Sequence, residues 1–181
     1  GASGTVSIFR NMSTAGSMSV SLMHTLDAGD ADVYSLAVGM LDGDGWPDLA
    51  MAIYGASSGT ISVFRNTTSA IGGISFSAIQ HIATGANPAS IAIADLDLDG
   101  KPDLAVSNLF NATLSVFRNG SISGSIAFGD RFDISVGSQP FSLAAGFLDD
   151  DNRPDIIVGN RGDSNLSIFF NTSLTGSISF G

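Results

Sequence analysis

The stretch DLDLDGKPDLAV (residues 95–106) puts four aspartates within nine residues and then continues into an apolar segment. Carboxylates stand at positions 1, 3, 5 and 9 of this loop and a glycine stands at position 6, namely Asp95, Asp97, Asp99, Asp103 and Gly100. Like charges so close together repel one another, so the pattern predicts that a bound cation neutralises them. Ca²⁺ takes about six to eight hard oxygen ligands, and a backbone carbonyl near position 7 can supply one more. The stretch therefore predicts a calcium loop, and a merely solvated acidic turn is the alternative.

Weaker copies of this loop occur on both sides. MLDGDGWPD (residues 40–48) has Met40 at position 1, and FLDDDNRPD (residues 147–155) has Phe147 there and Asn152 in place of the glycine. Asn tolerates positive φ better than most residues, so the turn can survive. The predicted ligands, with the position-7 residue contributing its carbonyl, are Asp95, Asp97, Asp99, Lys101 and Asp103; Asp42, Asp44, Trp46 and Asp48; and Asp149, Asp151, Arg153 and Asp155.

An EF-hand does not fit this pattern. It requires a Glu at position 12, and the chain contains no Glu. Position 12 of the middle loop is Val106, which lies in an apolar segment without a helical pattern on either side.

The acidic loops belong to a longer repeat. TVSIFRN (residues 5–11) recurs as TISVFRN (60–66), TLSVFRN (113–119) and NLSIFFN (165–171). Each unit has four short apolar segments separated by turn residues, which predicts four strands, as in a β-propeller blade. The first strands are expected at 35–41, 90–96 and 142–148, the second after Pro47, Pro102 and Pro154, the third at the quoted segments, and the fourth from GGISFS, GSIAFG and GSISFG onward.

The fold class predicted is therefore all-β, a propeller segment of four-stranded antiparallel blades with about three and a half repeats. We expect the third and fourth strands of one unit in residues 1–30 and blades in 31–84, 85–136 and 137–181. Small residues alternate along the first strands, at Ala37 and Gly39, Ala92 and Ala94, and Ala144 and Gly146, and would let neighbouring sheets approach closely. Three and a half blades do not close a ring of the usual four to eight or so. Either the chain is part of a longer one or several copies assemble.

Composition agrees with strands and turns and excludes several classes of function. All 17 acidic residues are Asp, the net charge is −10, and there are 22 Gly and no Cys. Without a basic stripe, binding of nucleic acid is not expected. No apolar run is long enough for a membrane span. The start, GASGTVSIFRN, lacks the features of a secretory signal, so an exported form would have lost its leader.

The segment IADLDLDGKPDLAVSN (residues 93–108), followed by TLSVFRN and SIAFG, resembles the FG-GAP/VCBS repeat of integrin α-subunit-like β-propellers. The resemblance covers essentially the whole chain and is specific in its Asp spacing. It implies a structural Ca²⁺ loop between the first and second strands of each blade. It also implies an extracellular or cell-surface protein that acts in adhesion or ligand recognition, with related propellers acting as lectins.

Three further features invite functional interpretations. Six N-x-S/T sequons occur, at Asn11, Asn66, Asn111, Asn119, Asn165 and Asn171. Four of them, Asn11, Asn66, Asn119 and Asn171, stand at the ends of the third strands, where they would be exposed acceptors for glycosylation. NRGDS (residues 160–164) matches an integrin-ligand motif, but it falls where a turn is expected. Trp46 is the only Trp, and it either packs over its loop or contacts a ligand.

Catalysis has little support, because Cys and Glu are absent and the two His residues, His24 and His81, recur at comparable places in the repeat. Two hypotheses follow. The chain is a non-enzymatic calcium-binding module that recognises a glycan or protein ligand, or it is a structural repeat protein that assembles with copies of itself into a fibre, sheath or oligomeric propeller.

Overall fold

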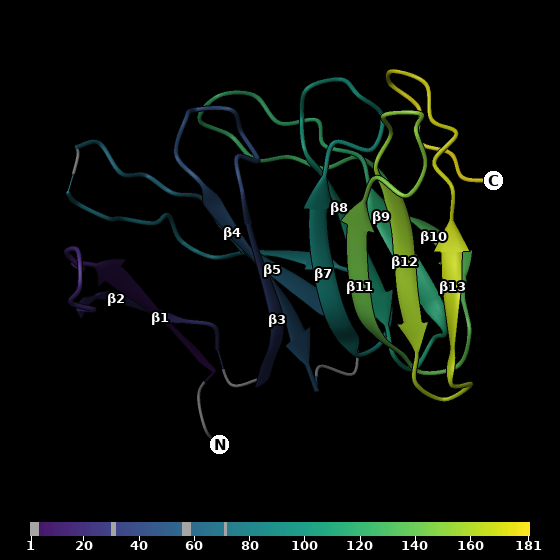
Figure 1. The fold of residues 1–181 in the computed structure, drawn as a ribbon, viewed down its shortest axis with the longest axis horizontal. Helices are drawn as coiled ribbons and strands as arrows, with labels where there is room; N and C mark the ends of the chain where they lie inside the picture. Colours follow the sequence, from purple (N-terminus) through teal and green to yellow (C-terminus); the bar gives the residue numbers. More distant parts are fainter. Residues whose placement is uncertain (1–3, 30–31, 56–58, 71) are drawn as a thin grey trace.

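The computed structural model describes residues 4–29, 32–55, 59–70 and 72–181 (Figure 1). The described residues form antiparallel sheets and contain no helix. None of them therefore forms a helix long and apolar enough to cross a membrane. The predicted unit boundary at residues 30 and 31 lies outside the described residues.

Four sheets follow one another in chain order. A hairpin joins β1 (Thr5–Asn11) to β2 (Val20–Asp27). Two four-stranded sheets follow, β3 (Asp32–Gly39), β4 (Asp48–Tyr54), β5 (Thr60–Phe64) and β6 (Gln80–Ala83), then β7 (Pro88–Ala94), β8 (Asp103–Asn108), β9 (Thr113–Phe117) and β10 (Phe132–Ser135). The last sheet has three strands, β11 (Pro140–Gly146), β12 (Asp155–Asn160) and β13 (Asn165–Phe169).

Each of the three larger sheets is an up-and-down meander in which sequence neighbours pair, as in a propeller blade. The described sheets stand side by side with the hairpin at one end and β13 toward the other (Figure 1), and they do not close into a ring. The all-β propeller-type fold predicted from the repeat is confirmed. The structure shows the strands, but the predicted limits of the repeating units stay predictions.

Two strand predictions need correction. The first strands end about two residues earlier than expected, at Gly39, Ala94 and Gly146, because the next residues already belong to the acidic loop. There the backbone N–H of Leu41 donates to the side-chain carboxylate of Asp48 and not to a main-chain carbonyl of β4. The SISF-type segments form only isolated bridges, such as Asn119 with Phe128, and the fourth strands β6 and β10 begin after them. The last sheet lacks a fourth strand among the described residues.

The core is divided into three clusters, one at each junction between neighbouring sheets. The middle cluster packs Ala50, Ala52 and Ile61 of one sheet against Leu104 and Val106 of the next. Small residues of the first strand make this approach possible, because a Cβ on Gly39 would lie 2.9 Å from Cγ2 of Ile93. The predicted packing role of the small pairs is thus confirmed at this junction, which we call the seam. A Cβ on Gly146, the equivalent residue of β11, would meet nothing within 4 Å.

Candidate metal centre in the aspartate loops

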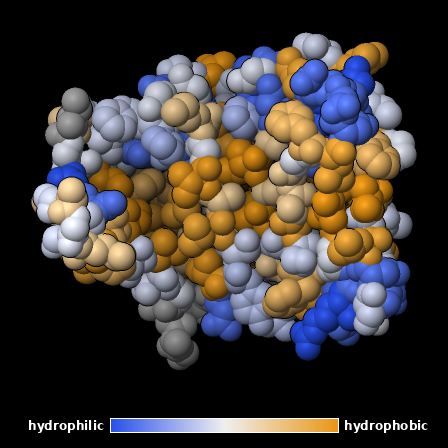
Figure 2. All heavy atoms as spheres, viewed as in Figure 1, coloured by the Kyte–Doolittle hydropathy of each residue, from blue (hydrophilic) through white to orange (hydrophobic). Residues whose placement is uncertain are grey.

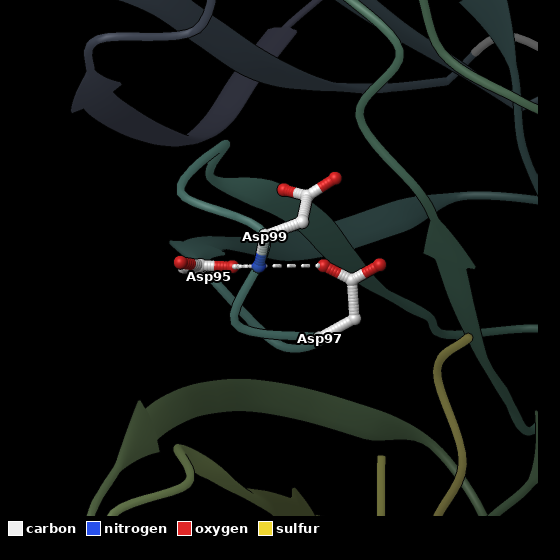
Figure 3. A group of neighbouring side chains, drawn as sticks. All are labelled: Asp95, Asp97 and Asp99. Atoms are coloured by element: carbon white, nitrogen blue, oxygen red, sulfur yellow. Dashed lines mark hydrogen bonds between the residues drawn. The ribbon is translucent and has the colours of Figure 1, made fainter. Parts of the chain in front are cut away.

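The middle loop brings three carboxylates together. Oxygens of Asp95, Asp97 and Asp99 lie within 4.8 Å of one another (Figure 3). The loop closes through main-chain donors, because the Asp99 N–H lies 3.1 Å from Asp95 Oδ1 and 3.2 Å from Asp97 Oδ1. Gly100, at φ +86°, donates to Asp95 at 2.9 Å. The positive φ is cheap for glycine and directs this N–H back into the loop. Three converging carboxylates form a donor set that fits a divalent cation.

The fourth predicted ligand, Asp103, lies outside this converging group. It is 0% exposed, and its two oxygens accept hydrogen bonds from the N–H groups of Leu96 and Asn119, both at 2.8 Å. Burial raises the pKa of Asp103 to about 6, although these two hydrogen bonds favour its ionised form. Asp103 therefore ties the end of the first strand to the end of the third. Its place in a coordination sphere, like that of the Lys101 carbonyl, stays a prediction.

Asp48 and Asp155 occupy the same place in the other two loops. Asp48 accepts from Leu41 at 2.9 Å and Asn66 at 2.8 Å, and Asp155 accepts from Leu148 at 2.9 Å and Asn171 at 2.8 Å. Burial raises the pKa of Asp48 as well. The position-9 aspartate is thus a structural feature common to all three loops.

In the first loop, Asp42 and Asp44 are bound by a cation from the protein itself. Arg65 contacts Asp42 through Nε at 2.5 Å and Asp44 through Nη2 at 2.6 Å. Burial alone would raise the pKa of Asp42, but Arg65 and the N–H groups of Asp44 and Gly124 hold it below its usual value. Trp46 is half-buried, and its main-chain N–H donates to Asp44 Oδ1 at 2.9 Å.

The middle loop has the same pairing. Arg118 contacts Asp97 through Nε and Asp99 through Nη2, both at 2.5 Å. No role was predicted for Arg65 and Arg118 from the sequence. The signal was available, because the third-strand motif repeats Arg at the same place in three units, at Arg10, Arg65 and Arg118.

The third loop is more open. Asp149 and Asp151 are exposed, and Arg153 contacts Asp151 at 3.1 Å. Asn152 adopts φ +61°, so the prediction that Asn can replace the loop glycine is confirmed.

The predicted glycosylation sites differ in exposure. Asn11, Asn111 and Asn165 are exposed. The expectation of exposure is wrong for the three asparagines that are buried beside the acidic loops, namely Asn66, Asn119 and Asn171. The reason is that their side-chain amides are structural donors: Asn119 Nδ2 donates to Leu41 O at 2.8 Å and to Pro102 O at 2.7 Å. A glycan on this nitrogen would replace one of its N–H groups and break at least one of these hydrogen bonds.

Two other sequence features have structural roles. His81 Nδ1 lies 2.9 Å from Ser62 Oγ on the neighbouring strand. The NRGDS segment forms the turn between β12 and β13, where Arg161 lies over the ring of Phe141, 5.8 Å from its centroid, and Asp163 accepts from the Ser138 N–H at 2.7 Å.

Comparison with known proteins agrees with this geometry. Residues 41–106, from the first acidic loop to the end of the apolar segment quoted above, match the FG-GAP-like repeat. The chain therefore contains an FG-GAP-like repeat. It is also similar to human integrin alpha-7, with 32% identity over 147 residues, which is 72% of this chain and 12% of that protein. The chain thus spans a small part of the length of this relative.

Proposed function

We propose that this chain is a calcium-binding β-propeller module of an extracellular or cell-surface protein that recognises a protein or glycan ligand and catalyses no reaction. The observation that carries the proposal is the convergence of three carboxylates in the middle loop of an FG-GAP repeat chain. Ca²⁺ is the proposed ion because all donors in the loop are hard oxygens. Asp95, Asp97 and Asp99 would hold it, with the carbonyl of Lys101 and the carboxylate of Asp103. The ion would neutralise the loop and hold its shape.

A recognition role is supported by where the loops lie. The first and second acidic loops and the turn at residues 121–123 line one groove of about 300 Å³, which includes Asp42, Gly43, Lys101 and Ile122. Loops held on a rigid scaffold are common binding surfaces. We assign ligand contact to this groove, where Lys101, the only Lys of the chain, offers a cation beside carboxylates.

Calorimetric titration with Ca²⁺ tests the metal. Asp95→Asn is the best probe, because Asp95 contacts only main-chain N–H groups within its loop. We expect Asp95→Asn to weaken binding about tenfold or more at one site. Asp130→Asn, which changes the same charge at an exposed position outside the loops, should bind like the unmodified chain. Equal binding by all three proteins would contradict the assignment of the site.

Recognition is tested separately. A glycan array and a panel of immobilised extracellular proteins would be probed with the chain in Ca²⁺ and in chelator. Saturable binding that Lys101→Ala weakens supports the proposed groove. Binding that Lys101→Ala leaves unchanged contradicts it.

A second candidate function, assembly with copies of itself, is favoured by exposed apolar side chains on β3 beside the hairpin and on β13 in the last sheet. Leu36 and Val38 of β3 are 50% and 62% exposed beside a groove of about 460 Å³ that β1 also lines. Leu166 and Ile168 of β13 are 64% and 47% exposed. Figure 2 shows apolar side chains across the middle of this view of the molecule. Apolar patches of this kind are typical of interaction surfaces.

The two exposed faces are of complementary type. At the seam, the face that carries Ala37 and Gly39 packs against the face that carries Ile91 and Ile93. Among the described residues, the face of β11–β13 that is equivalent to the Ala37 and Gly39 face is uncovered. The face of β3 that is equivalent to the Ile91 and Ile93 face is partly uncovered. Light scattering should then give an oligomer that Leu166→Lys dissociates. A monomer at every concentration, with ligand binding intact, would reject assembly and retain recognition.

A further inference from the structure

The guanidinium of Arg118 contacts two of the three carboxylates that converge in the middle loop. It contacts Asp97 Oδ2 and Asp99 Oδ2, two carboxylates of the converging group, each at 2.5 Å. Both pairs are charge-assisted, and the planar guanidinium fits two oxygens at once. Arg118 is 39% exposed, while the side chain of Asp97 is fully buried. A buried carboxylate without a counter-charge is costly, so this arginine stabilises the loop as it stands.

The same oxygen of Asp97 also contacts the following sheet. The N–H of Gly176 donates to Asp97 Oδ2 at 3.0 Å, and Gly176 lies in the turn after β13. This turn covers the arginine, because a Cβ on Gly176 would lie 3.8 Å from Arg118 Nη2. A single carboxylate oxygen therefore joins the loop, the arginine and the next sheet.

The arrangement is repeated one unit earlier. Asp42 Oδ2 accepts from Arg65 at 2.5 Å and from the N–H of Gly124 at 3.0 Å, and Gly124 belongs to the turn of the following sheet. A Cβ on Gly124 would lie 3.8 Å from Arg65 Nη2. Because the whole set of contacts recurs, it is a feature of the repeat and not a chance ion pair at the surface.

The third loop lacks this set of arginine contacts. The place of Arg118 is taken by Phe170, which is 47% exposed, and Asp149 and Asp151 remain exposed. Arg10 occupies the equivalent place in β1, but it donates to the carbonyl oxygen of Gly72.

We propose that Arg65 and Arg118 are built-in counter-cations that compete with a divalent ion for the first two loops and so set how strongly the ion stabilises each junction between sheets. This inference rests on the proposed calcium binding. Without the ion, each arginine keeps its loop closed and its junction intact. When the ion binds, Asp97 and Asp99 must be shared with it or released by the arginine, so part of the binding free energy is spent on breaking the ion pairs. The first two loops then bind the ion weakly, and their junctions persist when the ion is removed.

Arg118→Gln tests the competition, since Gln keeps a polar side chain and removes the charge. We expect Ca²⁺ to bind the middle loop roughly fivefold more tightly in this variant, a value in keeping with a partly exposed ion pair. In chelator, the same variant should have a lower melting temperature than the unmodified chain. Arg10→Gln is the matched control, because it removes an arginine at the same place in the motif that contacts no loop aspartate, and it should leave Ca²⁺ affinity unchanged.

Phe170→Arg is the reciprocal test. It supplies the missing arginine to the third loop, and it should weaken Ca²⁺ binding there and raise the melting temperature in chelator. Unchanged affinity in both Arg118→Gln and Phe170→Arg, with binding still present, would overturn the competition and leave calcium binding in place. Absence of Ca²⁺ binding from every variant would instead reject the calcium proposal, and the competition with it.

Discussion

At the scale of single residues, the position-9 aspartate of each acidic loop has a role that is independent of any ion. The carboxylate of Asp103 accepts two main-chain hydrogen bonds, one from Leu96 just after β7 and one from Asn119 just after β9. Because the group is fully buried, its ionised form lacks solvation, and burial raises its pKa to about 6. The carboxylate thus loses its solvation but gains two hydrogen bonds that join the ends of the first and third strands.

A pH dependence follows from this pKa. Between the ordinary value of 3.8 and about 6, the folded chain binds a proton at Asp103 more readily than the unfolded chain does. The contribution of Asp103 to the free energy of unfolding should therefore be largest below this window and fall as pH rises through it. Urea denaturation in chelator, compared between the unmodified chain and Asp103→Asn, isolates this contribution. A difference between the two proteins that does not change with pH would contradict the prediction.

At the scale of strands, the first strand of each unit is defined by small residues on the face toward the next sheet. Gly39 has no room for a side chain because Ile93 lies against it, whereas Gly146 in β11 faces open space. Two glycines at the same position of the repeat thus contribute differently to the stability of the fold.

We expect Gly39→Ala to lower the free energy of unfolding by about 1–3 kcal/mol, since the added methyl would overlap Ile93 in a packed seam. Gly146→Ala is the control and should change stability by less than about 0.5 kcal/mol. Neither glycine adopts a positive φ, so backbone strain does not confuse the comparison. Equal effects of the two substitutions in chemical denaturation would argue against close packing at the seam.

At the scale of the whole molecule, the sheets are joined near the acidic loops by polar contacts as well as by the apolar core. Asn119 and Asn171 reach from one sheet to the carbonyl oxygens of Leu41 and Leu96 in the preceding sheet, each at 2.8 Å. Asn66 donates to Pro47 within its own unit.

Asn119→Ala should therefore destabilise the molecule more than Asn66→Ala, by about 1–2 kcal/mol, the cost of a buried carbonyl left without its donor. Guanidinium denaturation of both variants measures the difference. Hydrogen exchange would show increased opening around Leu41 in the Asn119 variant alone. Identical losses in both variants would mean that the bond across the seam contributes nothing.

The sequence by itself determined the parts of this protein that depend on local periodicity. Four-strand units, converging aspartates and the turn at Asn152 all follow from spacing within a short segment, where side chains alternate or converge by backbone geometry alone. The limits of the first strands were missed because Leu41, Leu96 and Leu148 look like strand residues but give their N–H groups to loop aspartates.

Only the tertiary structure decided the contacts between units. The bonds from Asn119 to Leu41, Asn171 to Leu96, Gly124 to Asp42 and Gly176 to Asp97 join residues 78, 75, 82 and 79 positions apart. Such contacts hold Asn119 and Asn171 against the preceding unit and bring the turns at Gly124 and Gly176 onto loop aspartates of that unit. A motif specifies which groups are present, but the packing of one sheet on the next determines which of them meet, because that contact depends on the shape of both surfaces.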